Sequence, residues 1–162
     1  MRFLTNGMLG KLTRWLRLAG HDVIYVGELK VPAKEQDECL VRKARDEGRI
    51  LLTKDMGLYR RASKGGVRAL LIRGTTVVSQ IREISSEFGV RIKINQEKSR
   101  CPMCNGELEK RGMREVKNFL PEKITKSKRT FWICSRCGKI YWRGKHWKNI
   151  LKTVRELGEV RA

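Results

Sequence analysis

Short apolar runs alternate with amphipathic segments through the first 94 residues of the chain. The runs predict strands at 3–5, 23–26, 50–53 and 68–72, followed by an alternating edge strand at 90–94. Apolar residues at helical spacing predict helices at 9–19, 36–47, 56–62 and 76–88, and a glycine follows three of these helices. Strands that alternate with helices form parallel sheets, so we predict an α/β fold with helices on both faces of the sheet.

The strand at 50–53 ends at a candidate functional position. It consists of branched apolar residues, as in a strand buried on both faces, and Asp55 follows where the chain leaves the sheet. Ligands of open α/β sheets bind at the carboxyl ends of the strands, which favours a metal or substrate contact for Asp55. Asp is also a preferred helix cap, and capping the next helix explains this residue equally well.

Other polar residues follow the strand ends in the same way. Asn6 follows the first strand, and Asp37 and Glu38 begin the helix after the second. Clustered carboxylates bind Mg²⁺ or Mn²⁺, which activate water and neutralise phosphate charge. The alternative for Asp37 and Glu38 is the general preference for acidic residues in the first turn of a helix, which would account for one of them.

A second module follows a polar linker at 95–100. Two C-x-x-C pairs, each followed by a glycine-containing turn, place four thiols at Cys101, Cys104, Cys134 and Cys137. This pattern predicts a zinc ion held by four cysteines, with disulfide or redox chemistry as the alternative. Four protein ligands leave no open coordination position, so the zinc would fold the module and would not catalyse. We predict two domains, 1–95 and 96–162, the second ending in a helix at 148–157.

The charge of the chain indicates its partner. The 162 residues contain 37 Lys+Arg and 17 Asp+Glu, a net charge of +20 and a pI near 10.3. Residues 1–96 carry +9 and residues 97–162 carry +11, so the excess is not confined to a tail. Such a balance favours nucleic acid as the partner. The sequence lacks an apolar stretch typical of a membrane span or a signal peptide, which favours a cytoplasmic protein, and few glutamines beside many Lys, Arg and Glu are typical of thermophiles.

Basic and aromatic residues near the predicted strand ends and in the second module are candidates for RNA binding. The candidates are Lys11, Arg14, Arg17, Lys54, Lys126, Lys128, Arg129, Trp142, Arg143, Lys145 and His146. Aromatic residues between cations, as at 140–147, can stack on bases while their neighbours pair with phosphates. Alternatives stay open: a solvated helix face for the cations, and packing in a small core for the aromatics. His146 could be a general acid/base, or a lone histidine that is exposed or packed.

Several stretches together resemble one known family. They are 3–12, 15–17, 49–57, 101–106 and 141–147, and they run over nearly the whole chain in the family's order. The sequence is similar to the Mut-seven C-terminal ribonuclease family, a PIN-like nuclease domain followed by a zinc ribbon. The resemblance implies a PIN-like α/β fold, RNA as the substrate, and hydrolysis assisted by Mg²⁺ or Mn²⁺.

The resemblance also implies an active site, with one departure. Asp37 and Asp55 match acidic positions of the family, and Glu38 is adjacent. Asn6 stands where the first strand of the family usually ends in Asp, and an amide brings no negative charge to a cation. Three accounts of Asn6 are open: a natural variant that still cleaves, a natural binder without activity, and an engineered inactivation.

Two main functions follow from these observations. The first is a metal-dependent endoribonuclease whose PIN-like domain cleaves RNA while the four-cysteine module helps to hold it. The second is a non-catalytic RNA-binding factor, docking on ribosomal or other structured RNA through the same basic surface. A toxin-type ribonuclease held by a partner protein is a third possibility, against which the zinc module argues.

Overall fold

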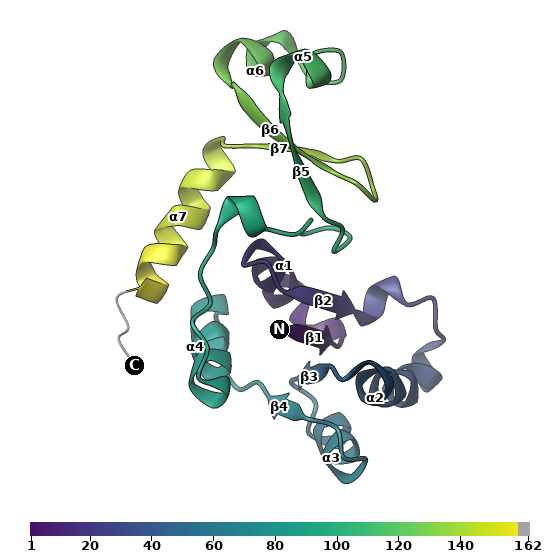
Figure 1. The fold of residues 1–162 in the computed structure, drawn as a ribbon. Coiled ribbons are helices and arrows are strands. Elements are labelled where there is room, and N and C mark those ends of the chain that lie inside the picture. Colours follow the sequence, from purple (N-terminus) through teal and green to yellow (C-terminus); the bar gives the residue numbers. More distant parts are fainter. Residues whose placement is uncertain (159–162) are drawn as a thin grey trace.

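The computed structural model describes residues 1–158, which form two β-sheets with helices around them (Figure 1). The first sheet consists of β1 (Arg2–Thr5), β2 (Asp22–Tyr25), β3 (Ile50–Thr53) and β4 (Ala69–Leu71). Its helices are α1 (Gly10–Leu18), α2 (Gln36–Glu47), α3 (Met56–Lys64) and α4 (Val77–Phe88). Short 3-10 turns are η1 (Gly7–Leu9), η2 (Val26–Glu28), η3 (Ala33–Glu35) and η4 (Gln96–Lys98).

All neighbouring strands of the first sheet are parallel, in the order β2-β1-β3-β4. The strands β1 and β3 are therefore central, and Thr5 lies opposite Leu52 in their register. The predicted α/β fold with a parallel sheet is confirmed. In this arrangement the carboxyl ends of all four strands meet at one edge, where the sequence places its polar candidates.

Two apolar clusters cover the two faces of this sheet. The side chain of Phe3 packs with residues of α1 and α4, whereas the next residue, Leu4, packs with residues of α2 and α3. Successive residues of a strand point to opposite faces, so one short strand contributes to both clusters. Helices on both faces leave the strand ends as the accessible part of the sheet.

The prediction of an edge strand at 90–94 is wrong, because the sheet ends at β4 and this segment has no strand pairing. Its alternation has another cause: Ile92 is buried in the cluster that contains Phe3, while Arg91 and Lys93 are exposed. Alternating burial requires only that one side of an extended segment contacts a core. It does not require that the backbone pairs with a neighbouring strand.

The second sheet is antiparallel, in the order β5-β6-β7. Its strands are β5 (Leu108–Gly112), β6 (Thr130–Cys134) and β7 (Ile140–Trp142), and the β5–β6 connection carries α5 (Met113–Val116) and α6 (Glu122–Ser127). The last helix, α7 (Lys145–Gly158), begins three residues earlier than predicted. Figure 1 shows α7 leading from β7 back to α4, with which it is in contact. No helix of the described part of the chain is long and apolar enough to cross a membrane.

The first cysteine pair lies directly against the parallel sheet. Asn105, which follows Cys104, accepts a hydrogen bond from the backbone N–H of Val23 at 3.0 Å. Nearby, the hydroxyl of Ser99 donates to the carbonyl of Leu18 at 2.6 Å. These bonds fix the cysteine-containing turn to the end of α1 and to the edge strand β2.

Candidate active site and metal centre

Asn6 and Asp55 follow the ends of the two central strands. Because Thr5 lies opposite Leu52, the residues that leave β1 and β3 do so side by side. The turn η1 begins directly after Asn6 and contacts β3. It is also tied to the neighbouring strand, since the Tyr25 hydroxyl donates to the carbonyl of Gly7 at 3.2 Å. The fold therefore places Asn6 in a fixed turn at the carboxyl edge of the sheet.

The side-chain oxygen of Asn6 has an unusual environment. It is buried and has no hydrogen-bond partner within residues 1–158, and the side chain does not cap η1. A buried acceptor without a donor costs about 1–3 kcal/mol. An unpaired oxygen at a strand end suits a bound cation or a donor group of a substrate. In its chemistry this atom fits a divalent metal, although it contributes no charge.

Asp55 is held by two local hydrogen bonds. Its backbone N–H donates to Thr53 Oγ1 at 3.0 Å, and its Oδ1 accepts from the backbone N–H of Leu58 at 2.8 Å. Asp55 thus caps α3, which confirms the capping role considered from the sequence. The residue is nevertheless exposed at the strand end, so capping and ligand binding by the same carboxylate are compatible.

Asp37 and Glu38 lie in the first turn of α2, as predicted. The carboxylate of Asp37 is 3.9 Å from the guanidinium of Arg61 on α3, and both side chains are about half exposed. Such a pair contributes little to stability. Within the described residues, the four cysteines are the only group of three or more Cys, His, Asp or Glu whose ligand atoms lie close enough for one metal ion. The structure thus does not gather Asp37, Glu38 and Asp55 into one cluster.

Three of the predicted cations lie around this edge. Lys11 and Arg14 are exposed on α1, which begins there, and Lys54 precedes Asp55. In the described part of the chain none of the three forms an ion pair, so their charges are available to a polyanion.

Arg17 is different, and the prediction that it lies on an exposed RNA-binding face is wrong. Its side chain is 2% exposed and pairs with Glu28 at 2.7 Å. Its Nε and Nη2 donate to the carbonyl of Val23, and its Nη1 donates to the carbonyl of Pro102 at 3.1 Å. The guanidinium is used inside the protein, where it connects α1, β2 and the first cysteine pair.

The four predicted cysteine ligands converge. All four sulfurs lie within 4.8 Å of one another, with 3.8 Å between Cys101 and Cys137 and 3.3 Å between Cys104 and Cys134. A disulfide needs about 2.05 Å, whereas tetrahedral zinc with bonds of about 2.3 Å separates its sulfurs by roughly 3.8 Å. The cysteines are free in the structure, and this cluster could hold a zinc ion.

The surrounding backbone suits thiolate ligands. The backbone N–H groups of Arg136 and Cys137 point at Cys134 Sγ from 3.4 and 3.5 Å. Burial alone would raise the pKa of Cys134, but these donors and the neighbouring thiols lower it, whereas burial and the neighbouring thiols raise the pKa of Cys104. A Cβ on Gly106 would lie 2.6 Å from Cys134 Sγ, so only glycine fits there. The Tyr141 hydroxyl lies 3.1 Å from Cys101 Sγ, an outer contact of the kind that orients metal ligands.

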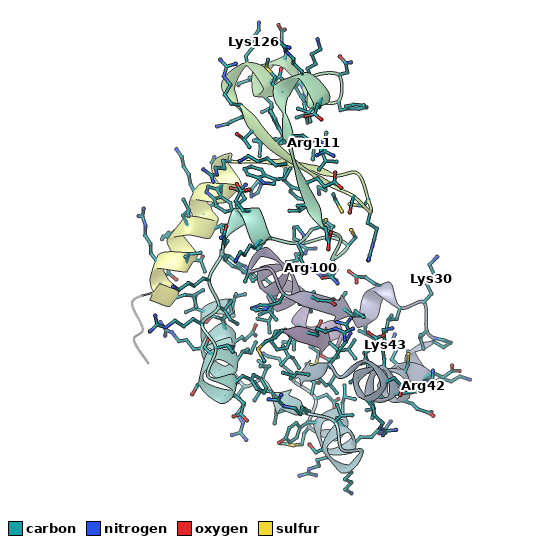
Figure 2. The ribbon with its side chains drawn as sticks, in the orientation of Figure 1. Lys30, Arg42, Lys43, Arg100, Arg111 and Lys126 are labelled. Atoms are coloured by element: carbon teal, nitrogen blue, oxygen red, sulfur yellow. The ribbon has the colours of Figure 1, made fainter. Side chains whose placement is uncertain are left out.

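The RNA-binding candidates of the second module do not form one surface. Lys128, Arg129 and Arg143 line a common hollow, whereas Trp142 lines an apolar groove on the opposite face of the sheet. Lys145 and His146 are exposed at the start of α7, and Lys126 is exposed on α6. Figure 2 shows labelled cations on both parts of the molecule, around α2, on β5 and on α6.

Among the residues of that hollow that were missed from the sequence are Lys110 and Trp132. Lys110 lies on β5 directly opposite Trp132 on β6, and both line the hollow with Arg143. Lys110 belongs to an ordinary charged stretch, and Trp132 to an apolar run that predicts only a strand. The pairing of two strands brings them together, and no local pattern signals it.

These features define a class of protein. A parallel α/β domain with polar strand ends and unpaired cations is joined to a four-cysteine module, in a strongly basic chain. The Mut7-C RNAse domain matches residues 1–154, and the chain belongs to this family of ribonuclease domains. No curated protein and no solved structure gave a significant match.

Proposed function

We propose that this protein is a metal-dependent endoribonuclease that binds and hydrolyses RNA. The observation that carries the proposal is the match of the Mut7-C RNAse domain to residues 1–154, nearly the whole chain. The net charge of +20 supports a polyanionic substrate. We assign the nuclease to residues 1–95 and the RNA-holding, zinc-binding part to residues 96–162.

The proposed site is the carboxyl edge of the parallel sheet. Asn6 and Asp55 would hold Mg²⁺ or Mn²⁺, with Asp37 and Glu38 approaching from α2 when substrate binds. The bound cation would supply charge neutralisation at the scissile phosphate and an activated water. Around it, Lys11, Arg14 and Lys54 would pair with neighbouring phosphates and position the RNA backbone. The exposed carboxylate of Asp55 and the unpaired buried oxygen of Asn6 support this assignment.

A second candidate function is RNA binding without cleavage. It is favoured by Asn6 itself, which offers a neutral oxygen where a carboxylate would bind a hard cation more strongly. It is also favoured because the carboxylates of Asp37, Glu38 and Asp55 do not lie close enough together to hold one metal ion. In this alternative the same basic surface docks on ribosomal or other structured RNA.

Cleavage of mixed cellular RNA in Mn²⁺ or Mg²⁺ separates the two functions. The assay compares the wild-type chain with Asn6→Asp and Asp55→Asn. Asp55→Asn is preferred to Asp55→Ala because Asn also caps helices. The substitution therefore removes the charge of Asp55 and keeps its capping role. RNA binding is measured in parallel, without a divalent cation, to show that each variant still engages its substrate.

We expect the wild type to cleave, Asn6→Asp to cleave faster, and Asp55→Asn to bind RNA without cleaving it. Cleavage by Asn6→Asp alone would identify a nuclease scaffold that Asn6 disables. Binding by all three chains with cleavage by none would establish the non-catalytic alternative.

A further inference from the structure

A hollow of about 300 Å³ lies between the linker and the second sheet. One wall is the face of the sheet that carries Lys110 and Trp132, and the rim includes Lys128, Arg129 and Arg143. The linker contributes Glu97, from the turn η4. The hollow is thus formed by four segments of the chain, and it is separate from the edge of the parallel sheet.

The charges of the hollow are strongly unbalanced. Four cations face one carboxylate, that of Glu97, which pairs with Lys110 at 3.3 Å. Among the described residues, Lys128 and Arg129 form no ion pair, and Arg143 donates through Nε to the uncharged side chain of Gln96 at 2.6 Å. Three of the four positive charges are therefore left without a counterion from residues 1–158.

Trp132 forms part of the same wall. The residue is 2% exposed, and its indole N–H has no hydrogen-bond acceptor in residues 1–158. The Arg143 guanidinium lies over its ring, 5.8 Å from the ring centroid. Because the indole N–H is buried, the donors that the wall offers to a ligand are those of its lysine and arginine side chains. The wall therefore presents positive charge and hydrogen-bond donors together, which suits an anionic, oxygen-rich ligand.

The two faces of the second sheet differ in chemistry. The residues next to Trp132 in β6 point to the opposite face of the sheet. On that face an apolar groove is lined by Ile133, Ile140 and Trp142, together with the exposed Phe119. The cations of the hollow are thus confined to one face and to the loops beside it. This confinement distinguishes the hollow from the general basicity of the chain.

We propose that this hollow binds the phosphodiester backbone of single-stranded RNA. Phosphate oxygens would pair with Lys128, Arg129 and Arg143, and they would compete with Glu97 for Lys110. A hollow of this size accepts a single strand, whereas a duplex presents its phosphates on a broad outer surface. The inference rests on the proposed RNA-binding function and adds a binding site remote from the candidate active site.

Substitution of Glu97 is expected to strengthen RNA binding, whereas substitutions in a binding site usually weaken it. Glu97→Gln removes the one negative charge of the hollow and frees Lys110, so RNA should bind roughly twofold to fivefold more tightly. The matched control is Glu109→Gln, on the same strand as Lys110 but pointing to the opposite face, where it pairs with Arg111. Both variants change the net charge equally, but Arg111 keeps a second partner, Glu115, at 3.3 Å.

A second pair of variants removes cations. Lys128→Ala/Arg129→Ala should lower the slope of log K against log salt concentration by about 1.4, as expected for two lost phosphate contacts to a single strand at about 0.7 each. The control, Lys117→Ala/Lys123→Ala, makes the same charge change in the same module outside the hollow. Binding is measured by fluorescence anisotropy of a labelled single-stranded oligonucleotide with zinc-loaded full-length protein, without Mg²⁺ or chelator. Zinc content confirms that each variant is folded.

The outcomes separate this inference from the proposed function. Tighter binding by Glu97→Gln alone, with a reduced slope for the Lys128 and Arg129 variant alone, supports the hollow as an RNA site. If each variant behaves as its control while the wild type binds RNA, the hollow is not the site. If inorganic pyrophosphate is bound there and RNA binding does not respond to these variants, the hollow is a site for free anions and the inference is wrong. If the wild type does not bind RNA at all, the proposed function itself fails.

Discussion

The side-chain amide of Asn105 donates a hydrogen bond to Asp22 Oδ1 over 2.7 Å, although 83 residues separate the two in sequence. Asn105 belongs to the turn after the first cysteine pair, and Asp22 begins the edge strand β2. Its backbone φ of +66° is left-handed, a conformation that Asn adopts more readily than most residues. One residue therefore shapes the cysteine turn and docks it on the parallel sheet.

Asn105→Gly should destabilise the protein while leaving the turn conformation accessible. Glycine adopts positive φ freely, so the loss is confined to the side-chain hydrogen bonds to Asp22 and to the backbone of Val23. The loss of these two bonds, one buried and one partly buried, predicts a decrease of about 1–3 kcal/mol in the free energy of unfolding, measured by urea denaturation. Asn118→Gly, at an exposed position between α5 and α6, is the control, and an equal effect of both would contradict the docking role.

Substitution by Gln should have different effects at Arg17 and at Arg14: the first should reduce stability, and the second should affect RNA binding. Arg17 is buried in contacts with Glu28 and Pro102, so Arg17→Gln should lower the free energy of unfolding by about 2 kcal/mol or more. Arg14 is exposed, so Arg14→Gln should leave stability nearly unchanged and reduce the salt dependence of RNA binding. Urea denaturation and anisotropy titrations measure the two effects. A reduced salt slope for a folded Arg17→Gln protein would show that our structural assignment is wrong.

Asn6→Asp should make the stability of the protein depend on divalent cations. A carboxylate oxygen in the buried place of Asn6 Oδ1 would be costly without a positive partner, so the variant should unfold at lower temperature than the wild type in the absence of Mn²⁺. Added Mn²⁺ should restore its melting temperature, because binding to the folded state stabilises that state. The wild type should respond much less. Equal responses of both proteins to Mn²⁺ would argue against a metal ligand at position 6.

Removal of one zinc ligand should unfold the second module selectively. Cys104→Ser should abolish the binding of one zinc ion per chain, measured by atomic absorption, whereas Cys39→Ser should retain it because Cys39 lies outside the cluster. Loss of the zinc should also weaken RNA binding through the second module. Full zinc content in Cys104→Ser would contradict a site held by all four cysteines.

Asp22 should make stability fall in acid. Burial alone would raise its pKa, but hydrogen bonds from Arg49 and Asn105, together with the charges of Arg49 and Arg100, lower it from 3.8 to about 2. The stabilisation is therefore complete above about pH 4 and is lost as the pH falls towards 2, an effect of about 2 kcal/mol. Asp22→Asn should flatten this part of the profile of unfolding free energy against pH.

His21 should affect the stability of the protein in a separate, higher pH range. Burial, and to a lesser degree the positive N-terminus, lower its pKa from 6.5 to about 4, so the folded state favours the neutral ring. Stability should therefore decrease as the pH falls from about 6.5 to about 4, where the unfolded chain binds the additional proton. His21→Gln should remove this decrease and leave the lower one, which depends on Asp22. If the profile of unfolding free energy against pH shows only one transition, and either variant abolishes it, the assignment of two separate transitions to Asp22 and His21 is wrong.

Much of this architecture was determined by the sequence itself. Apolar spacing predicted the four parallel strands and their helices, because burial of one helix face or of a whole strand leaves a periodic pattern. The spacing of Cys101, Cys104, Cys134 and Cys137 predicted the thiol cluster, because short C-x-x-C turns bring each pair of sulfurs together. The charge excess is a property of composition and needs no fold.

Only the tertiary structure decided which polar residues face solvent and which face one another. Arg17 and Arg14 look alike in sequence, yet the cysteine turn covers Arg17 and leaves Arg14 exposed. The hollow around Trp132 and the contact of Asn105 with Asp22 join segments that are far apart along the chain. Local periodicity reports burial against a core, but it contains no information on which distant segment provides the covering surface.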